Sequence, residues 1–503
     1  MFLRKKFNKS GKISVQIIDK SSGKYKVLKT IGSSSVSTQI DKLVEIGNQW
    51  IKDKIGQKEI DFTNEIDYAN HFLENINQIS IVGIDLLLGK IFDEIGFNQI
   101  PDPIFKLLVL SRISFPCSKL KTTDYFLKYQ YIGIDVWQIY RYMDKLHKSQ
   151  KETVQQISYL HSLKILGGTI NIVFYDVTTL HFETDNADEI RKTGFSKEGK
   201  HQNPQILLGL LVSLDGYPLA YEIFEGNKYE GHTMLGVLEA FKTKYKIEKL
   251  IVVADAGLLT NANINELTIK GYEFIIGAKI KSESKLMKEQ ILSLKLKDKE
   301  SRVIKYEDKT RLIIGYSKHR AAKDKYNRER GLQKIEKQIK SGKLTKSSIN
   351  NRGYNKYLTI AGNVNVSVNY EKFEQDAVWD GLKGYRTNTK LTKEEIIQNY
   401  SQLWKIEKAF RISKHDLKIR PIYHRIQRRI EAHICISFTA YKVYKELERL
   451  LKVKQSNLSP EKAIEIAKTI YSVKTRTPKH NHEIKKIIYI TEQQRLLAEL
   501  FNF

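Results

Sequence analysis

Two aspartates follow the two most apolar strand-like segments of the sequence. Residues 169–175 lead directly into Asp176, and residues 249–254 lead into Asp255. Functional groups of α/β sheets gather beyond the carboxyl ends of the strands, so neighbouring strands would bring these carboxylates side by side. Close carboxylates repel each other unless a cation lies between them, and oxygen ligands of this kind select Mg²⁺ or Mn²⁺. The pattern indicates metal-assisted phosphoryl chemistry, although each aspartate alone would also serve as a simple cap after its strand.

A third acid, Glu407, lies on a segment with helical spacing. The capping box Thr392-Lys-Glu-Glu395 predicts that a long helix begins there and runs to about Lys414. Residues three or four apart share one helical face. On this face we expect Tyr400, Leu403, Glu407, Arg411 and Lys414. A ladder of surface ion pairs explains the same spacing, and Asp380 is a rival to Glu407 as the third ligand.

The elements around the aspartates predict an α/β sheet. Strand patterns at 205–214 and 217–224 flank the turn Asp215-Gly216, and a further strand pattern covers 272–278. Helical patterns cover 232–245 and 263–270. Strands alternating with helices in this way predict a sheet covered by helices, which is the architecture that the two aspartates require.

The charge of the chain indicates a polyanionic partner. Lys and Arg total 85 against 57 Asp and Glu, a formal net charge of +28. A field of this sign concentrates polyanions, and neutralised phosphates release counterions from DNA or RNA. A Lys-rich proteome would also raise the charge, but +28 exceeds what solubility requires. The segment 318–346 alone contains 11 Lys or Arg against 3 acids.

Several classes of protein are excluded by the sequence. No apolar run approaches the roughly 20 residues that span a bilayer, and the N-terminus does not resemble a secretory signal, so we expect a soluble intracellular protein without a membrane partner. Cys117 and Cys435 are expected to be unpaired core thiols. His480-Asn481-His482 is too small for a zinc site, and the near P-loop at 226–233 has His232 where a Lys is essential.

The carboxylates and their surroundings resemble the DDE transposases of bacterial insertion sequences. The resemblance is to the branch that carries a β-rich insertion between the second Asp and the Glu, and a signature of Tyr, Arg, Glu and Lys. Tyr400, Glu407 and Lys414 stand in register with that signature, whereas Leu403 occupies the position of its Arg. Further similarity lies at 194–205, at 209–227, at Asp255-Ala-Gly257 and at 417–433.

The resemblance implies a fold and a set of roles. The fold is ribonuclease-H-like, with two Mg²⁺ or Mn²⁺ ions held by Asp176, Asp255 and Glu407. Asp176 would bridge both ions, while Asp255 and Glu407 would each bind one. Tyr400 and Lys414 would hold a DNA phosphate. Arg411, and after it Lys405, would replace the missing Arg at position 403.

We therefore expect a DNA transposase that binds the terminal repeats of an insertion sequence and transfers strands by attack of a 3′-hydroxyl. Its partners would be double-stranded DNA and a second copy of the chain, in the bacterial cytoplasm at the nucleoid. The alternatives are an inactive DNA-binding derivative and a ribonuclease-H-like nuclease without strand transfer. The expected segments are a hairpin plus helix (1–75), a helical DNA-contacting region (76–165), the first part of the catalytic domain (166–280), a β-rich basic insertion (281–379), the second catalytic part (380–450) and a basic helical tail (451–503).

Overall fold

The structure is a computed structural model of the chain. It describes residues 1–55, 70, 72–196, 199, 201–258, 260–306, 310–341, 353–361, 365–476 and 482–503. These form two units, one made of Met1–Asn77 with Thr475–Ile484, the other of Gln78–Lys474 with Lys485–Phe503. Among the described residues, no helix combines the length and the apolar character needed to cross a membrane. Of the histidine cluster at 480–482, His480 and Asn481 lie outside the described residues.

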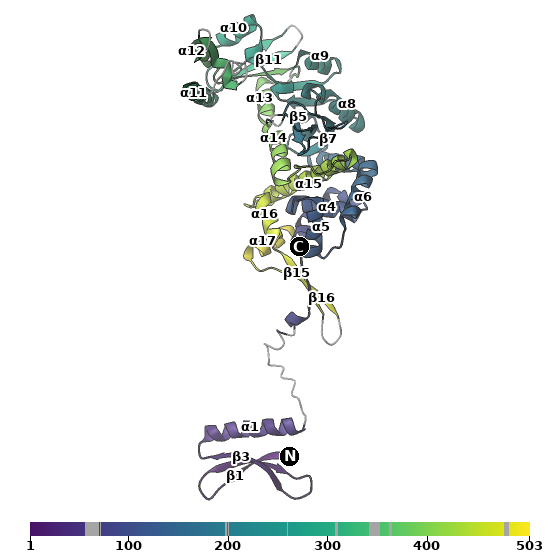
Figure 1. Cartoon of the computed structure of the whole chain (residues 1–503), viewed down its shortest axis with the longest axis vertical. Coiled ribbons are helices and arrows are strands. Elements are labelled where there is room, and N and C mark those ends of the chain that lie inside the picture. The colour runs from purple at the N-terminus through teal and green to yellow at the C-terminus, as the bar shows by residue number, and fades with distance from the viewer. Residues whose placement is uncertain are drawn as a thin grey trace. The chain divides into compact units, whose positions relative to one another are not determined.

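The first unit is a small sheet covered by one helix. Strands β1 (Phe2–Phe7), β2 (Ile13–Asp19) and β3 (Lys26–Ser34) pair in antiparallel order, so the expected hairpin has a third strand. Helix α1 (Ser37–Ile55) lies along this sheet (Figure 1). The contact is close because a Cβ on Gly47 would come within 2.5 Å of Leu3.

The second unit is built on an eight-stranded sheet in the order β10-β11-β14-β9-β8-β5-β6-β7. The central strand β5 pairs antiparallel with β6 and parallel with β8, and β9 continues parallel to β8. The order β7-β6-β5-β8-β9 is the ribonuclease-H-like arrangement that the family resemblance implies. The strands are β5 (Ile172–His181), β6 (Gln205–Ser213), β7 (Pro218–Glu225), β8 (Ile251–Ala254), β9 (Glu273–Ala278), β10 (Ser301–Lys305), β11 (Arg311–Tyr316) and β14 (Leu382–Thr387).

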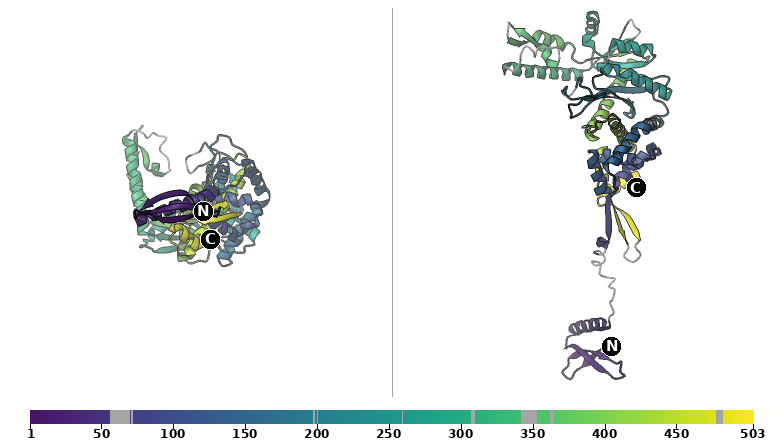
Figure 2. Two further views of the ribbon diagram at one scale, coloured as in Figure 1. Left: turned by 90° about the horizontal axis from the view of Figure 1, so that it is seen from below. Right: turned by 45° about the vertical axis from the view of Figure 1, so that its right-hand side comes forward.

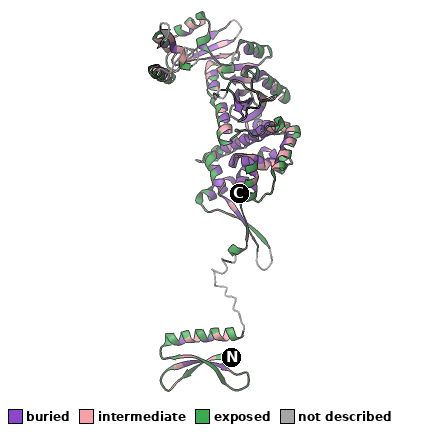
Figure 3. Cartoon of the chain, viewed as in Figure 1, coloured by how far each residue is buried: buried purple, intermediate pink, exposed green. Residues whose placement is uncertain are grey.

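Helices cover both faces of this sheet, and its central strands β5, β6 and β8 are buried along almost their whole length (Figure 3). One face packs against α8 (Met234–Tyr245) and α9 (Asn261–Ile269) through Val173, Tyr175 and Ala254, among others. The opposite face packs against α14 (Trp404–Arg411) and the long, almost wholly buried α15 (Gln427–Val453), through Phe174 and Val253 among others. Successive side chains of a strand point to opposite faces of the sheet, so every second residue packs on the same face.

Further helices of the second unit pack against α15. The helical pattern expected between 76 and 165 corresponds to α3–α7, preceded by the strand β4 (Ile76–Ile81). Cys117 and Cys435 are unpaired thiols, as expected, and Cys435 is buried. The helices are α3 (Lys90–Ile95), α4 (Pro103–Ser114), α5 (Lys119–Tyr125), α6 (Val136–Lys145), α7 (Lys151–Ile165) and, before α14, α13 (Lys393–Ser401).

The segment between β9 and β14 contains helices as well as strands. Its strands β10 and β11 extend the central sheet, because β11 pairs with β14 and β14 pairs with β9. Beyond them, a two-stranded ribbon lies beside the long helix α11, as the right-hand view of Figure 2 shows. The described elements are α10 (Lys285–Ser293), α11 (Lys318–Lys340), β12 (Leu358–Ala361), β13 (Asn365–Val368) and α12 (Tyr370–Ala377).

The C-terminal segment is mixed, which corrects the expectation of a helical tail. Helices α16 (Pro460–Ala467) and α17 (Glu492–Phe501) flank two strands, β15 (Tyr471–Arg476) and β16 (Glu483–Ile488). These strands form a sheet in the order β16-β15-β4. Because β4 is almost 400 residues earlier in the chain, as the Ser80–Ser472 hydroxyl contact shows, the pairing left no local signal in the sequence.

Candidate active site

Asp176 and Asp255 occupy equivalent positions on neighbouring parallel strands. The parallel register pairs Tyr175 with Ala254, so the two aspartates follow one residue further along. Tyr175 and Ala254 pack on the α8–α9 face, and the aspartates therefore belong to the face that α14 covers. Asp176 is not at the end of its strand, because β5 continues to His181, and its Oδ1 accepts a hydrogen bond from the Val177 N–H at 2.8 Å.

The helix that carries Glu407 is interrupted. The capping box at Thr392 is present, but α13 ends at Ser401 and α14 begins at Trp404. The expected single face is consequently divided: Tyr400 and Leu403 are buried, whereas Glu407 and Arg411 are exposed. A buried Leu403 fills part of the core, so the position at which the resemblance has an Arg serves packing here.

Tyr400 connects α13 to the second aspartate. Its phenol donates a hydrogen bond to Asp255 Oδ1 at 3.1 Å. The hydroxyl fits because residue 277 on β9 is a glycine, where a Cβ would come within 2.4 Å of it. Burial and the negative charge of Asp255 raise the pKa of Tyr400, so the phenol remains a donor at neutral pH.

Lys383 on β14 lies within electrostatic reach of two of the acids. Burial and the charge of Arg320 lower the pKa of Lys383, while Asp255 and Glu407 raise it. Its ammonium also lies over the Tyr400 ring, 4.4 Å from the ring centre. Asp255 and Glu407 come from different elements, yet the charges of both act on Lys383 and Tyr400. The sequence does not indicate Lys383, because a single lysine on a short strand carries no signal.

The chemistry of these side chains suits a hard divalent cation. Carboxylate oxygens are the ligands that Mg²⁺ and Mn²⁺ prefer. Among the described residues, no three His, Cys, Asp or Glu side chains are already grouped as a metal-binding set. Like charges repel one another, and Asp255 and Glu407 are exposed, so their side chains can rotate towards a cation that neutralises them.

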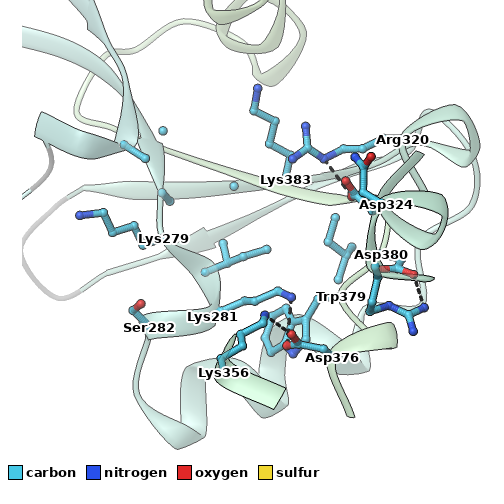
Figure 4. A pocket seen from close by; sticks show the side chains of 18 of the residues that line it. Lys279, Lys281, Ser282, Arg320, Asp324, Lys356, Asp376, Trp379, Asp380 and Lys383 are labelled. Carbon is cyan, nitrogen blue, oxygen red and sulfur yellow. Dashed lines mark hydrogen bonds and ion pairs between the residues drawn. The ribbon is translucent and has the colours of Figure 1, made fainter. Parts of the chain in front are cut away.

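A basic pocket of about 630 Å³ begins at Asp255 and extends over the segment between β9 and β14. Its cations face carboxylates across short distances (Figure 4). Lys281 lies 3.1 Å from Asp376, and Arg328 lies 2.8 Å from Asp380. Asp380, the rival third ligand, is thus held in an ion pair. The labelled cations of the pocket are Lys279, Lys281, Arg320, Lys356 and Lys383.

The remaining candidate residues of the sequence lie on or just after α14. Lys405 donates a hydrogen bond to the Leu214 carbonyl at 2.7 Å, which ties α14 to the turn between β6 and β7. Arg411 is exposed at the end of α14. Lys414 lies in the π-helical turn Ile412–Asp416 that follows.

Lys408, next to Glu407, anchors α14 to α15. It donates a hydrogen bond to Glu448 at 2.5 Å, and Lys445 binds the same carboxylate. Burial would raise the pKa of Glu448, but the hydrogen bonds from these two lysines lower it to about 2. The carboxylate thus stays ionised and holds the helix of Glu407 against the core.

This anchor predicts a pH-dependent stability. Because the folded pKa of Glu448 is depressed, its contribution is complete above about pH 4.5 and is lost as the pH falls towards 2. We expect Glu448→Gln to lower the free energy of unfolding by about 2 kcal/mol at pH 7. The difference from the unaltered protein should shrink between pH 4.5 and 2 in urea titrations. A difference that stays constant over this range would contradict the assignment.

The sequence of the chain matches the transposase DDE domain family over residues 167–442. The chain belongs to this family of DDE transposases. The matched region holds all three carboxylates together with Tyr400, Lys383 and Gly277, so the geometry described above lies in the family's shared domain. No curated protein sequence matches that of this transposase.

Solved structures of transposases are similar to this transposase at low identity. The piggyBac transposase synaptic complex with hairpin DNA is 9% identical over 80% of this chain and 79% of that chain, with a TM-score of 0.39. A Mos1 transposase paired-end complex with the left transposon end is 12% identical over 34% of this chain and 56% of that chain, with a TM-score of 0.16. A Mos1 mariner paired-end complex with Mn is 10% identical, covering 45% and 71% of the two chains, with a TM-score of 0.15.

Proposed function

We propose that this DDE transposase binds the terminal repeats of its own mobile element and cuts and transfers the DNA strands at Asp176, Asp255 and Glu407. The relation between the three acids supports the proposal. Asp176 and Asp255 occupy the same register position on adjacent parallel strands. The charge of Glu407 acts on the same two side chains, Lys383 and Tyr400, as the charge of Asp255. The family membership supplies the reaction class.

The three carboxylates would hold two Mg²⁺ or Mn²⁺ ions, and we assign Asp176 to the binding of both. Such ions activate an attacking oxygen and stabilise the leaving oxygen of a phosphodiester. The chain's own contribution is to fix the carboxylates: Tyr400 positions Asp255, and Lys408 fixes the helix of Glu407. Arg411 and Lys414, beyond Glu407 along the chain, are the candidates to bind DNA phosphates.

The assembly would contain double-stranded DNA and two copies of the chain, since transfer of an element requires both of its ends. Lys405 is assigned a structural part, because its ammonium is hydrogen-bonded to the Leu214 carbonyl. Arg411 is therefore the candidate to replace the Arg of the family signature, whose position is occupied by Leu403 in this chain.

The test uses the purified chain and a supercoiled plasmid that carries its coding sequence with the natural flanking DNA. With Mg²⁺ or Mn²⁺ we expect breaks at two defined ends and joined products, read by sequencing, and neither in EDTA. Defined breaks without joined products would indicate a nuclease that lacks strand transfer. Specific binding without any break would indicate an inactive DNA-binding derivative, and either result would overturn the proposal.

The Tyr400–Asp255 contact makes a further prediction at Gly277. A Cβ there would lie 2.4 Å from the Tyr400 hydroxyl, so Gly277→Ala must displace the phenol from Asp255. We expect metal-dependent cleavage to fall about tenfold or more, because misplacement of a ligand by about 1 Å is costly. Gly236→Ala is the matched control, since a Cβ at this exposed position on α8 meets nothing within 4 Å. Equal activity of the two variants would show that Tyr400 does not position Asp255.

A further inference from the structure

A second pocket of the same unit, of about 860 Å³, has an unusual charge. It lies where the end of α4 and the start of α5 meet the chain that follows α14. Six of its lining residues are Lys or Arg, and none of the described lining residues is an Asp or Glu. None of its lining residues lines the pocket at Asp255. The cations are Arg112, Lys119, Lys121, Lys418, Arg420 and Lys468.

Two of these cations are buried. Arg112 is 5% exposed and Lys119 is 6% exposed. Nη1 of Arg112 donates a hydrogen bond to the Lys418 carbonyl at 3.3 Å. Burial lowers the pKa of Arg112 to about 10; the Cys117 thiol acts in the opposite direction, and no carboxylate is among the causes of this shift. Burial and then the charge of Arg112 lower the pKa of Lys119 well below its usual value. The fold therefore places two basic side chains close together in a poorly hydrated site, where an anion would favour their protonated forms.

The imidazoles and Lys468 of the pocket do not compensate this charge. Burial and the neighbouring cations lower the pKa of His424 to about 3 and that of His433 as well, so both imidazoles are neutral at pH 7. Lys468 is paired with Glu465 at 2.7 Å, which lies outside the lining. A buried charge without an opposite charge is costly, so such an arrangement is stabilised by an anion that enters from outside.

The side chains suit a phosphate. A guanidinium presents a planar fork of donors and an ammonium a point charge, which together are the usual partners of phosphoryl oxygens. At the mouth of the pocket, Lys121 and Lys418 are exposed, and Arg420 is half-buried. Cations that continue from a buried pair onto the surface allow a phosphate that belongs to a longer chain, with neighbouring phosphates at the mouth.

We propose that this pocket binds a backbone phosphate of the DNA held by the transposase, at a place separate from the catalytic carboxylates. The inference rests on the proposed function, because it takes DNA as the polyanion. It assigns Arg112 and Lys119 to the buried phosphate, and Lys121, Lys418 and Arg420 to the backbone on either side.

The test measures binding of a fluorescent duplex made from the element's end, without divalent metal, over a range of salt concentrations. Each phosphate contact contributes a slope of about −0.9 to log K against log salt. We expect Lys119→Met to weaken binding about fivefold to tenfold at moderate salt and to reduce the slope by about one. Lys128→Met is the matched control, because it removes the same charge from an exposed site outside the pocket, and it should leave the slope unchanged.

Stability gives a second readout that a merely structural lysine would not reproduce. Lys119→Met removes a buried basic group that no carboxylate balances, so the free variant should melt a few degrees higher than the unaltered chain. Inorganic phosphate, at matched ionic strength, should raise the melting temperature of the unaltered chain and not that of the variant. Arg420→Gln, at the mouth, tests the same salt slope if Lys119→Met does not fold.

The outcomes separate this inference from the proposed function. A salt slope that is identical in the unaltered chain, in Lys119→Met and in Arg420→Gln overturns the pocket assignment. A phosphate-dependent rise in melting temperature with an unchanged DNA slope also overturns it, since the pocket would then bind a small anion. A reduced slope supports the pocket even if the chain proves unable to cut DNA, and Asp255→Asn should bind DNA with the slope of the unaltered chain.

Discussion

Asp255→Asn is expected to abolish metal-dependent cleavage, lowering the rate at least about 1000-fold. Asparagine has the same shape but lacks the negative charge that holds a divalent ion, and the ions supply several kcal/mol of transition-state stabilisation. Tyr400 can still donate its hydrogen bond to the amide oxygen, so the fold should be retained. Cleavage of the end-bearing plasmid in Mg²⁺ and Mn²⁺ measures the effect. Asp176→Asn and Glu407→Gln should behave in the same way.

Two other aspartates make this prediction specific. Asp185→Asn is the matched control, since Asp185 is exposed and its loss should change the rate less than about twofold. Asp380→Asn tests the rival ligand: it removes an ion pair with Arg328, and we expect only a modest loss of activity. An inactive Asp380→Asn beside an active Glu407→Gln would show that the third ligand has been assigned wrongly.

Glu446→Ala is expected to cost about 3–5 kcal/mol of stability, because it removes a buried carboxylate that binds several polar side chains. Glu446, on α15, accepts a hydrogen bond from Tyr217 at 2.9 Å and lies 2.6 Å from an Arg449 Nη2. His161 lies 3.8 Å away, and the charge of Glu446 also acts on the fully buried Lys442. Without it, Lys442 and Arg449 would be left as like charges near one another.

Urea unfolding, monitored by intrinsic fluorescence, measures this loss of unfolding free energy. Glu465→Ala is the matched control: like Glu446, Glu465 forms an ion pair with a basic residue three positions later, here Lys468, but its side chain is 64% exposed. Surface pairs contribute about 0–1 kcal/mol, so this variant should unfold close to the unaltered chain. Equal midpoints for the two variants would mean that the buried group is not held together by Glu446.

The central sheet and the two aspartates could be predicted from the sequence for a physical reason. Strands buried on both faces read as continuous apolar runs, and the runs at 169–175 and 249–254 correspond to β5 and β8, which do pair in parallel. The position of Asp176 was less exact, since β5 continues past it to His181. Antiparallel pairing with β6 extends the strand, and pairing partners are not visible locally.

The surroundings of the third carboxylate, Glu407, could not be predicted from the sequence. The spacing of residues 400–414 predicts one continuous helix, but the break between α13 and α14 depends on where Tyr400 and Leu403 are buried, which is a tertiary property. The contact of Tyr400 with Asp255 needs Gly277 from another strand. Lys383 was missed for the same reason, because only the pairing of β14 with β9 brings it to the site.

The pairing of β14 with both β9 and β11 also limits how the segment between β9 and β14 can be deleted or exchanged in this enzyme. Excision of residues 281–379 would remove β10 and β11 but leave β14 at the border of the sheet, with unsatisfied backbone donors and acceptors. Such a border invites edge-to-edge association between molecules. The segment is therefore poorly suited to exchange between relatives as a cassette, and a chimera would need to carry β14, with Lys383, along with it.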